Sequence, residues 1–229
     1  ILHFANSIAP GLTPLPLATD AATIRRFGYV GNLHPHKGLA VLIEAFNKLV
    51  DVDVTLEIWG AAFTQAFAAK LQRLCHNPKV RFAGSFSPPQ LAQVLSGIDM
   101  LILPSTIYEN SPMSILEAFA VRIPVIASNI GGMAELVQHD VNGLQFEVGD
   151  PQSLADTIRF AVTHPKRVQF YREGVYVIWK RPKNLSVDQR LRLDVTSAGL
   201  FYNRGMLHVI MSESGIPFYA AVPTPTIDW

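Results

Sequence analysis

Short apolar runs alternate with longer amphipathic stretches from Phe27 to about Val162, and this alternation constrains the fold more than any other feature of the sequence. Stretches such as 39–50 repeat apolar residues every three or four positions, as a helix with one buried face does. Strands separated by helices pair in parallel through right-handed crossovers. The pattern predicts an α/β fold, a doubly wound Rossmann-like parallel sheet, with strands at Phe27–Gly31, Val54–Trp59, Val80–Ala83, Met100–Leu103, Pro124–Ala127 and Gly143–Phe146. Such a sheet binds ligands at the carboxyl ends of its strands.

The segments on either side of this block differ from it. Residues 1–26 carry several prolines and a glycine between Pro10 and Pro16, and we interpret them as a linker or interdomain segment. Residues 27–173 are the predicted domain, and residues 174–229 an extension of unknown role that is β-rich or irregular. Because the chain starts at Ile1 rather than Met, we expect a piece of a longer protein. Strands or extended segments of the extension are predicted at Val175–Trp179, Leu191–Val195, Met206–Met211 and Pro217–Val222.

Composition limits the classes of function. Charged residues make up 16% of the chain, less than the roughly 25% of typical soluble domains, so some apolar surface is expected to meet a partner or another domain. A net charge of +1 gives no field that would collect nucleic acid, so any phosphate must be bound locally. Cys75 is the single cysteine, which excludes a disulfide framework and a multi-cysteine metal site. The sequence has no apolar run of membrane-spanning length, and we expect a cytoplasmic protein, free or bound at the inner face of a membrane.

The segment YENSPMSILEAFA, residues 108–120, follows a predicted strand and carries the clearest functional signal. Ser111 is a good N-cap and Pro112 a favoured first helical residue, so a helix should begin here and offer its free N–H groups to a phosphate or diphosphate. Glu109 would lie just before this helix and Glu117 inside it, where each carboxylate can accept hydrogen bonds from hydroxyl groups. The alternative is a capped amphipathic helix with Glu117 exposed on its outer face.

A second candidate segment is FGYVGNLHPHKG, residues 27–38. Gly31 at the end of the strand lets the backbone approach a ligand closely, and Lys37 at a helix opening is a mobile cation suited to a diphosphate. A solvated surface lysine is the alternative. Further along the chain, Gly131-Gly132 fit a tight turn from a strand into a helix, with Glu135 in the first helical turn.

Together these segments resemble the motifs of the family 4 retaining glycosyltransferases, whose GT-B fold consists of two Rossmann-like domains. Glu109 and Glu117 look like the family's pair of glutamates, residues 27–38 look like its first donor-site motif, and residues 131–137 look like its Gly-Gly-x-x-Glu helix start. The resemblance covers about residues 25–173 and points to the C-terminal, donor-binding half of the fold. It implies that, joined to its acceptor domain, the chain transfers a hexose from a nucleoside diphosphate sugar to an acceptor hydroxyl with retention.

The resemblance also implies roles for individual residues. Lys37 and Glu109 are the catalytic candidates, with Lys37 neutralising the leaving diphosphate and Glu109 contacting the donor sugar, while Glu117 binds the donor ribose. No metal and no cofactor is expected; the partners are a nucleotide sugar and, through the missing domain, an acceptor glycan, lipid or small molecule. The complete set of expected donor-binding residues is Gly31, Asn32, Lys37, Phe82, Glu109, Asn110, Ser111, Pro112, Met113, Ser114 and Glu117.

Asn32 is the clearest departure from the family, since relatives usually have an arginine there and a neutral amide cannot replace a guanidinium at a diphosphate. A compensating cation would be His34, His36 or Arg122, each of which is otherwise an ordinary surface or loop residue. Asn32 supports an alternative function, a catalytically degenerate domain that binds a sugar nucleotide or a protein partner. Other GT-B proteins, such as epimerases and phosphorylases, are a further alternative. A dehydrogenase is disfavoured because no Gly-x-Gly-x-x-Gly follows the first strand.

Overall fold

The computed structural model describes Leu12 and residues 23–109, 112–174, 176–178, 198–203, 206–211 and 219–223. A six-stranded sheet lies within residues 26–146. Its strands are β1 (Arg26–Val30), β2 (Thr55–Trp59), β3 (Val80–Gly84), β4 (Met100–Leu103), β5 (Val125–Ser128) and β6 (Gly143–Phe146). The 3-10 turns and helices that connect and follow them are η1 (Pro35–Lys37), α1 (Leu39–Asn47), α2 (Gln65–Leu74), η2 (Pro88–Gln90), α3 (Leu91–Ser96), α4 (Met113–Ala120), α5 (Gly131–Leu136), α6 (Pro151–Thr163) and α7 (Pro165–Gly174).

The sheet confirms the predicted doubly wound fold. All neighbouring strands pair in parallel, in the order β3-β2-β1-β4-β5-β6. Each strand begins and ends within one residue of its predicted bounds. The chain runs outward from β1 to β3, returns to the centre, and then runs outward again from β4 to β6. β1 and β4 therefore form the switch point, where ligands of such sheets bind.

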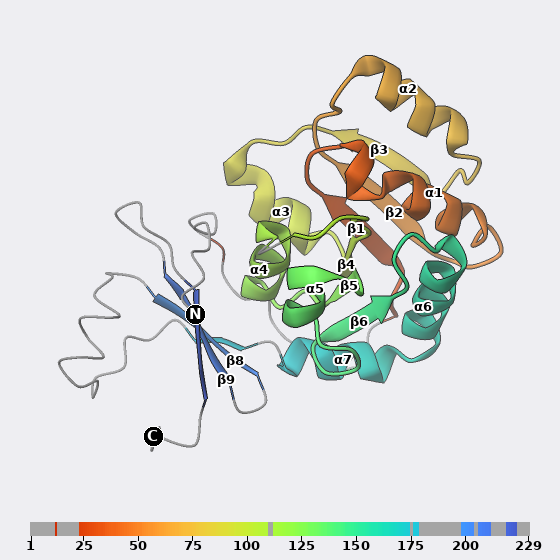
Figure 1. The fold of residues 1–229 in the computed structure, drawn as a ribbon. Helices are drawn as coiled ribbons and strands as arrows, with labels where there is room; N and C mark the ends of the chain where they lie inside the picture. Colours follow the sequence, from red (N-terminus) through yellow and green to blue (C-terminus); the bar gives the residue numbers. More distant parts are fainter. Residues whose placement is uncertain are drawn as a thin grey trace.

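Helices cover both faces of the sheet (Figure 1). Residues of α1, α2, α6 and α7 pack with one set of strand residues, and residues of α3, α4 and α5 pack with the other. Strand β4 shows how this arises, because Met100 and Ile102 point to the first core and Leu101 and Leu103 to the second. Its side chains are buried on both faces, as expected for a central parallel strand. The half-buried Cys75 packs against the first core, and burial raises the pKa of its thiol.

The described part of the extension contains a second sheet with antiparallel neighbours in the order β10-β9-β8-β7. These strands are β7 (Tyr176–Ile178), β8 (Ala198–Asn203), β9 (Met206–Met211) and β10 (Tyr219–Pro223). Three of them overlap predicted segments, β8 was not predicted, and the predicted segment Leu191–Val195 lies outside the described residues. The proposed boundaries at residues 26 and 173 stay a prediction. Among the described residues, no helix is both long and apolar enough to cross a membrane.

Candidate functional site

Two loops meet at the carboxyl edge of the sheet, one after β1 and one after β4. The first loop carries Lys37 and the second carries Glu109, which is 72 positions away in the sequence. The Lys37 ammonium lies 2.7 Å from Glu109 Oε2, and the two side chains are 30% and 14% exposed. The two predicted catalytic residues are therefore brought together as a partly buried ion pair at the switch point.

Glu109 is held by two contacts and has one carboxylate oxygen without a partner among the described residues. Its Oε2 pairs with Lys37, and its backbone carbonyl accepts a hydrogen bond of 2.8 Å from the N–H of Gly132. Its other carboxylate oxygen, Oε1, is buried and has no hydrogen-bond partner among the described residues. A buried carboxylate oxygen without a donor costs free energy, so this atom is suited to accept a hydrogen bond from a ligand.

The turn after β1 is held by a hydrogen bond from the side chain of Tyr29. The buried Tyr29 hydroxyl donates to the carbonyl of Asn32 at 2.8 Å, and an ideal Cβ on Gly31 would lie 3.2 Å from that hydroxyl oxygen. Gly31 has φ +153°, which favours glycine. Burial raises the pKa of Tyr29, and the nearby charge of Glu109 raises it further. Asn32 itself is exposed, so its position offers an uncharged side chain to solvent.

Helix α4 begins one residue later than predicted. Pro112 has an extended backbone, with φ −68° and ψ 117°, so it is the N-cap rather than the first helical residue. The half-buried Met113 and Ser114 are then the first two helical residues, and their N–H groups have no acceptor among the described residues. The Ser114 hydroxyl donates to the Val30 carbonyl at 3.0 Å, which ties α4 to the end of β1. Glu117 is the fifth helical residue and half-buried, not exposed on the outer face.

Two expected donor-binding residues, Asn110 and Ser111, lie outside the described residues. Phe82 is in β3, which β2 and β1 separate from β4, and its half-buried ring packs against the core that includes α1 and α2. The structure therefore groups Gly31, Asn32, Lys37, Glu109 and the start of α4 at the switch point, with Phe82 further toward one side of the sheet.

The three proposed substitute cations fall in different places. Arg122 follows the C-terminal end of α4 and precedes β5, so it lies at the opposite edge of the sheet from Lys37 and cannot serve the same ligand. His34 and His36 are in the same loop as Lys37, and their ring centroids are 5.0 Å apart. The His34 ring also lies 4.2 Å from the exposed ring of Phe63. Both histidines thus lie at the same edge of the sheet as Lys37.

Comparison with known proteins identifies the family. A family model described as Glycosyl transferases group 1 matches residues 24–164. The chain belongs to this family.

Several group 1 relatives and GT-B structures are similar to the chain. An uncharacterised glycosyltransferase of Methanocaldococcus jannaschii is 32% identical over 56% of this chain and 33% of its own length. The N-acetyl-alpha-D-glucosaminyl L-malate synthase of Bacillus anthracis is 28% identical over 73% of this chain and 45% of its own. The crystal structure of Anabaena HepE in complex with UDP and glucose gives a TM-score of 0.60 at 28% identity, over 68% of this chain and 43% of HepE. The chain thus spans less than half the length of these relatives.

One solved structure is a single domain of the same fold. It is the C-terminal domain of a group 1 glycosyltransferase, LpcC, from Francisella tularensis, with a TM-score of 0.59 at 19% identity. The match covers 75% of this chain and 95% of that domain. At this identity the likeness concerns the fold alone. It agrees with the Rossmann-like fold described above.

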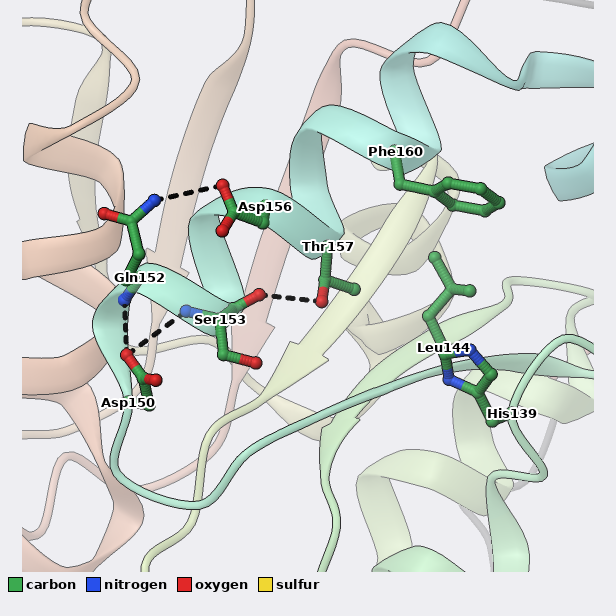
Figure 2. Close-up of a pocket in the computed structure, with 8 residues that line it drawn as sticks. All are labelled: His139, Leu144, Asp150, Gln152, Ser153, Asp156, Thr157 and Phe160. Carbon is green, nitrogen blue, oxygen red and sulfur yellow. Dashed lines mark hydrogen bonds between the residues drawn. The ribbon is translucent and has the colours of Figure 1, made fainter.

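A pocket of about 460 Å³ lies elsewhere on this group 1 glycosyltransferase unit, between β6 and α6 (Figure 2). Its polar end is formed at the start of α6, where Asp150 Oδ1 accepts hydrogen bonds from the N–H groups of Gln152 and Ser153. Leu144 and Phe160 form its apolar end. None of the expected site residues lines it. Its lining residues are His139, Leu144, Asp150, Gln152, Ser153, Asp156, Thr157 and Phe160.

Sequence reasoning did not find two residues that shape the group 1 site. Tyr29 was read only as part of a strand, because nothing in the linear pattern shows that its hydroxyl reaches the next turn. Gly38 has φ +70°, and an ideal Cβ there would lie 1.7 Å from the Pro104 carbonyl oxygen. The available signal for Gly38 was its place directly after Lys37 at the end of the segment 27–38. Glu135 was expected in the first turn of α5 but is the fifth residue of that six-residue helix, and it is exposed.

Within the described residues, no group of three His, Cys, Asp or Glu side chains is arranged to hold a metal ion.

Proposed function

We propose that this chain is the donor-binding half of a retaining family 4 hexosyltransferase that takes its sugar from a nucleoside diphosphate. The observation that carries the proposal is the ion pair of Lys37 with Glu109 at the switch point. Beside it, Glu109 Oε1 is buried and has no hydrogen-bond partner among the described residues. A cation next to a hydroxyl-accepting carboxylate matches the two chemically different parts of a nucleotide sugar. Lys37 suits the diphosphate, and Glu109 suits the sugar.

The surroundings of the pair support a diphosphate at this edge. Both α1 and α4 begin here, so the positive ends of two helix dipoles lie on the same side of the sheet. In the proposed reaction, negative charge develops on the diphosphate as the bond to the sugar breaks. Lys37 and the first N–H groups of α4, at Met113 and Ser114, would stabilise that charge in place. Glu117, half-buried on the same helix, would bind the donor ribose.

The comparisons support the donor class. HepE of Anabaena has been solved in complex with UDP and glucose and with UDP-glucose, and the Bacillus anthracis relative is named an N-acetyl-alpha-D-glucosaminyl L-malate synthase. We further propose that donor binding needs no metal, that the acceptor is bound by a second domain, and that the protein acts in the cytoplasm, with or without attachment to a membrane face. Hexose transfer and retention belong to the same proposal.

A calorimetric titration of the chain with UDP-glucose, UDP-N-acetylglucosamine and GDP-mannose tests donor binding. We expect one of these to bind, and Glu109→Gln to weaken that binding about tenfold or more, because a charged hydrogen-bond acceptor for a sugar hydroxyl is lost. The parent nucleoside diphosphate should lose much less affinity, since it has no sugar to contact Glu109. Glu117→Ala should weaken both ligands alike, because the ribose is common to them.

Glu44→Gln is the matched control, since Glu44 is an exposed carboxylate on α1. Its affinities should equal those of the unaltered chain, and addition of EDTA should also leave them unchanged. Binding of no nucleotide sugar, or equal affinity with and without the Glu117 carboxylate, would contradict the proposal. A loss of binding in EDTA would contradict its metal-free part.

Asn32 favours a second candidate function, a degenerate domain that binds a sugar nucleotide or a protein partner without catalysis. Its exposed amide supplies no positive charge, and Lys37 is already paired with Glu109. In the full-length protein, Asn32→Arg distinguishes the two functions. A large gain in turnover would indicate a weakened enzyme, whereas nucleotide-sugar binding with no turnover in either form would favour the degenerate domain.

A further inference from the structure

The carbonyl oxygen of His36 receives three hydrogen bonds from the loop after β4. The Thr106 N–H donates to it at 2.9 Å, the Thr106 hydroxyl at 3.1 Å and the Ser105 hydroxyl at 3.2 Å. Ser105 is buried and Thr106 half-buried, so these bonds are largely shielded from water. A carbonyl oxygen has two lone pairs, so three donors saturate it and leave its peptide group little freedom.

This carbonyl belongs to the residue before Lys37, and its donors lie three and four positions before Glu109. The contact therefore joins the two loops at a point next to both members of the ion pair. A second close contact lies beside it, since the backbone at Gly38 approaches the Pro104 carbonyl so closely that a Cβ would lie 1.7 Å from it. The paired residues of β1 and β4 are Phe27 with Met100 and Gly28 with Leu101, so this pairing ends two residues before the end of each strand.

We propose that Ser105 and Thr106 are positioning residues, which hold the backbone of Lys37 against Glu109 through the His36 carbonyl. Lysine is a flexible side chain that loses rotamer freedom when it is held in one geometry. When the backbone of Lys37 is fixed, the ammonium samples fewer positions, so less conformational freedom is lost when it pairs with Glu109. The positioning stands on contacts in the protein alone; its consequence for donor binding rests on the proposed function.

The first experiment needs no ligand. The coupling between Lys37 and Glu109 is measured from denaturant unfolding of the chain with Lys37→Met, Glu109→Gln and both changes. We expect a coupling of about fivefold in the unfolding equilibrium constant, toward the upper end for ion pairs because both side chains are partly buried. The same cycle is repeated in a chain that carries Ser105→Ala and Thr106→Val, where the coupling should fall below about twofold.

Two further variants separate positioning from general stability. Thr106→Ser keeps a hydroxyl and should restore the coupling. Thr157→Val is the matched control, because the Thr157 hydroxyl donates to the Ser153 carbonyl at 2.8 Å on α6, away from the pair. The coupling should be unchanged in that background. An undiminished coupling in the Ser105→Ala/Thr106→Val chain would overturn the inference. Should that chain not fold, Thr106→Val alone permits the same comparison, with equal couplings again counting against it.

A second experiment measures the consequence of this positioning for the binding of a nucleotide sugar. Affinity for the nucleotide sugar that binds the unaltered chain should fall about fivefold in the Ser105→Ala/Thr106→Val variant and recover with Thr106→Ser. Unchanged affinity would show that the contact does not serve the donor. If no nucleotide sugar binds the unaltered chain, the proposed function fails, while the ligand-free cycle still decides whether Ser105 and Thr106 position the pair.

Discussion

Glu109 combines three environments within one residue. One carboxylate oxygen pairs with Lys37, the other is buried with no donor among the residues that the structure describes, and the backbone carbonyl accepts a hydrogen bond from Gly132 in α5. The neighbouring Gly131 has a φ of +54°, a backbone conformation that favours glycine, and a Cβ there would lie 3.0 Å from the Tyr108 ring. The hydrogen bond from Gly132 thus holds the backbone of Glu109 in place.

The raised pKa of Tyr29 predicts how the free energy of unfolding depends on pH. Because burial and the charge of Glu109 raise the pKa of Tyr29 in the folded chain, the unfolded chain releases this proton first, near pH of about 10. The stability contributed by the neutral phenol is complete below that pH and is lost as pH rises toward the folded pKa. We expect the unfolding free energy to decline from about pH 9 to about pH 11, less steeply in Tyr29→Phe.

The measurement is denaturant unfolding at several pH values. Near neutral pH, Tyr29→Phe should cost about 1 kcal/mol through the lost bond to the Asn32 carbonyl. Tyr171, whose pKa is also raised by burial and by Asp140, is present in both chains, so the difference between them isolates Tyr29. Parallel pH curves for the two chains would show that Tyr29 does not titrate in this way.

Residue types and local spacing made Lys37, Glu109 and Glu117 candidates, because the first two follow strands and the third lies in the next helix. Their roles at a donor site came from the resemblance to a family and stay a prediction. The contact between Lys37 and Glu109 could not be predicted from spacing. It depends on β4 lying beside β1, and 72 positions separate the two side chains. The same holds for Tyr29, whose hydroxyl bond depends on the conformation of the turn that follows it.

At the scale of elements, β4 and β5 were predictable because both of their faces are buried, which produces continuous apolar runs such as Met100–Leu103. Helix starts were less so. Proline fits both the first helical position and the N-cap, and the extended ψ of Pro112 places it at the N-cap of α4. The shift leaves the N–H groups of Met113 and Ser114 at the helix opening.

Gly38 permits a sharp test of how α1 is attached to β4. Gly38→Ala combines a left-handed backbone with a Cβ at 1.7 Å from the Pro104 carbonyl, and we expect it to cost about 3 kcal/mol or more. Gly149→Ala is the matched control, since Gly149 has φ +74° and open space around the added atom. It should cost about 1 kcal/mol, from the backbone conformation alone.

Thermal and denaturant unfolding of the two alanine variants measure the difference. It isolates the close approach of the two backbones from the effect of a positive φ. Equal losses in Gly38→Ala and Gly149→Ala would mean that the loop before α1 can move away from β4 at no cost. In that case it could not fix Lys37 relative to Glu109 either.

At the scale of the whole molecule, the chain matches less than half the length of its group 1 relatives. We expect this chain by itself to bind its donor and to transfer no sugar, because acceptor binding is proposed for a second domain. The measurement is release of nucleoside diphosphate from the bound donor in the presence of candidate acceptor sugars and lipids. Product formed by the chain alone at a rate well above spontaneous hydrolysis would contradict this expectation.

The sheet order also governs when the site can form. Strands β1 to β3 are neighbours in sequence and can pair early, but the inner edge of β1 stays open until β4 has been made and has returned to the centre. During synthesis, Lys37 therefore leaves the ribosome well before its partner glutamate. If a nucleotide sugar binds as proposed, it cannot stabilise the first half of the sheet alone, and it should stabilise the pairing of the two halves once β4 is in place. Under the proposed function, the concentration of the nucleotide sugar in the cell would then act on the yield of folded protein.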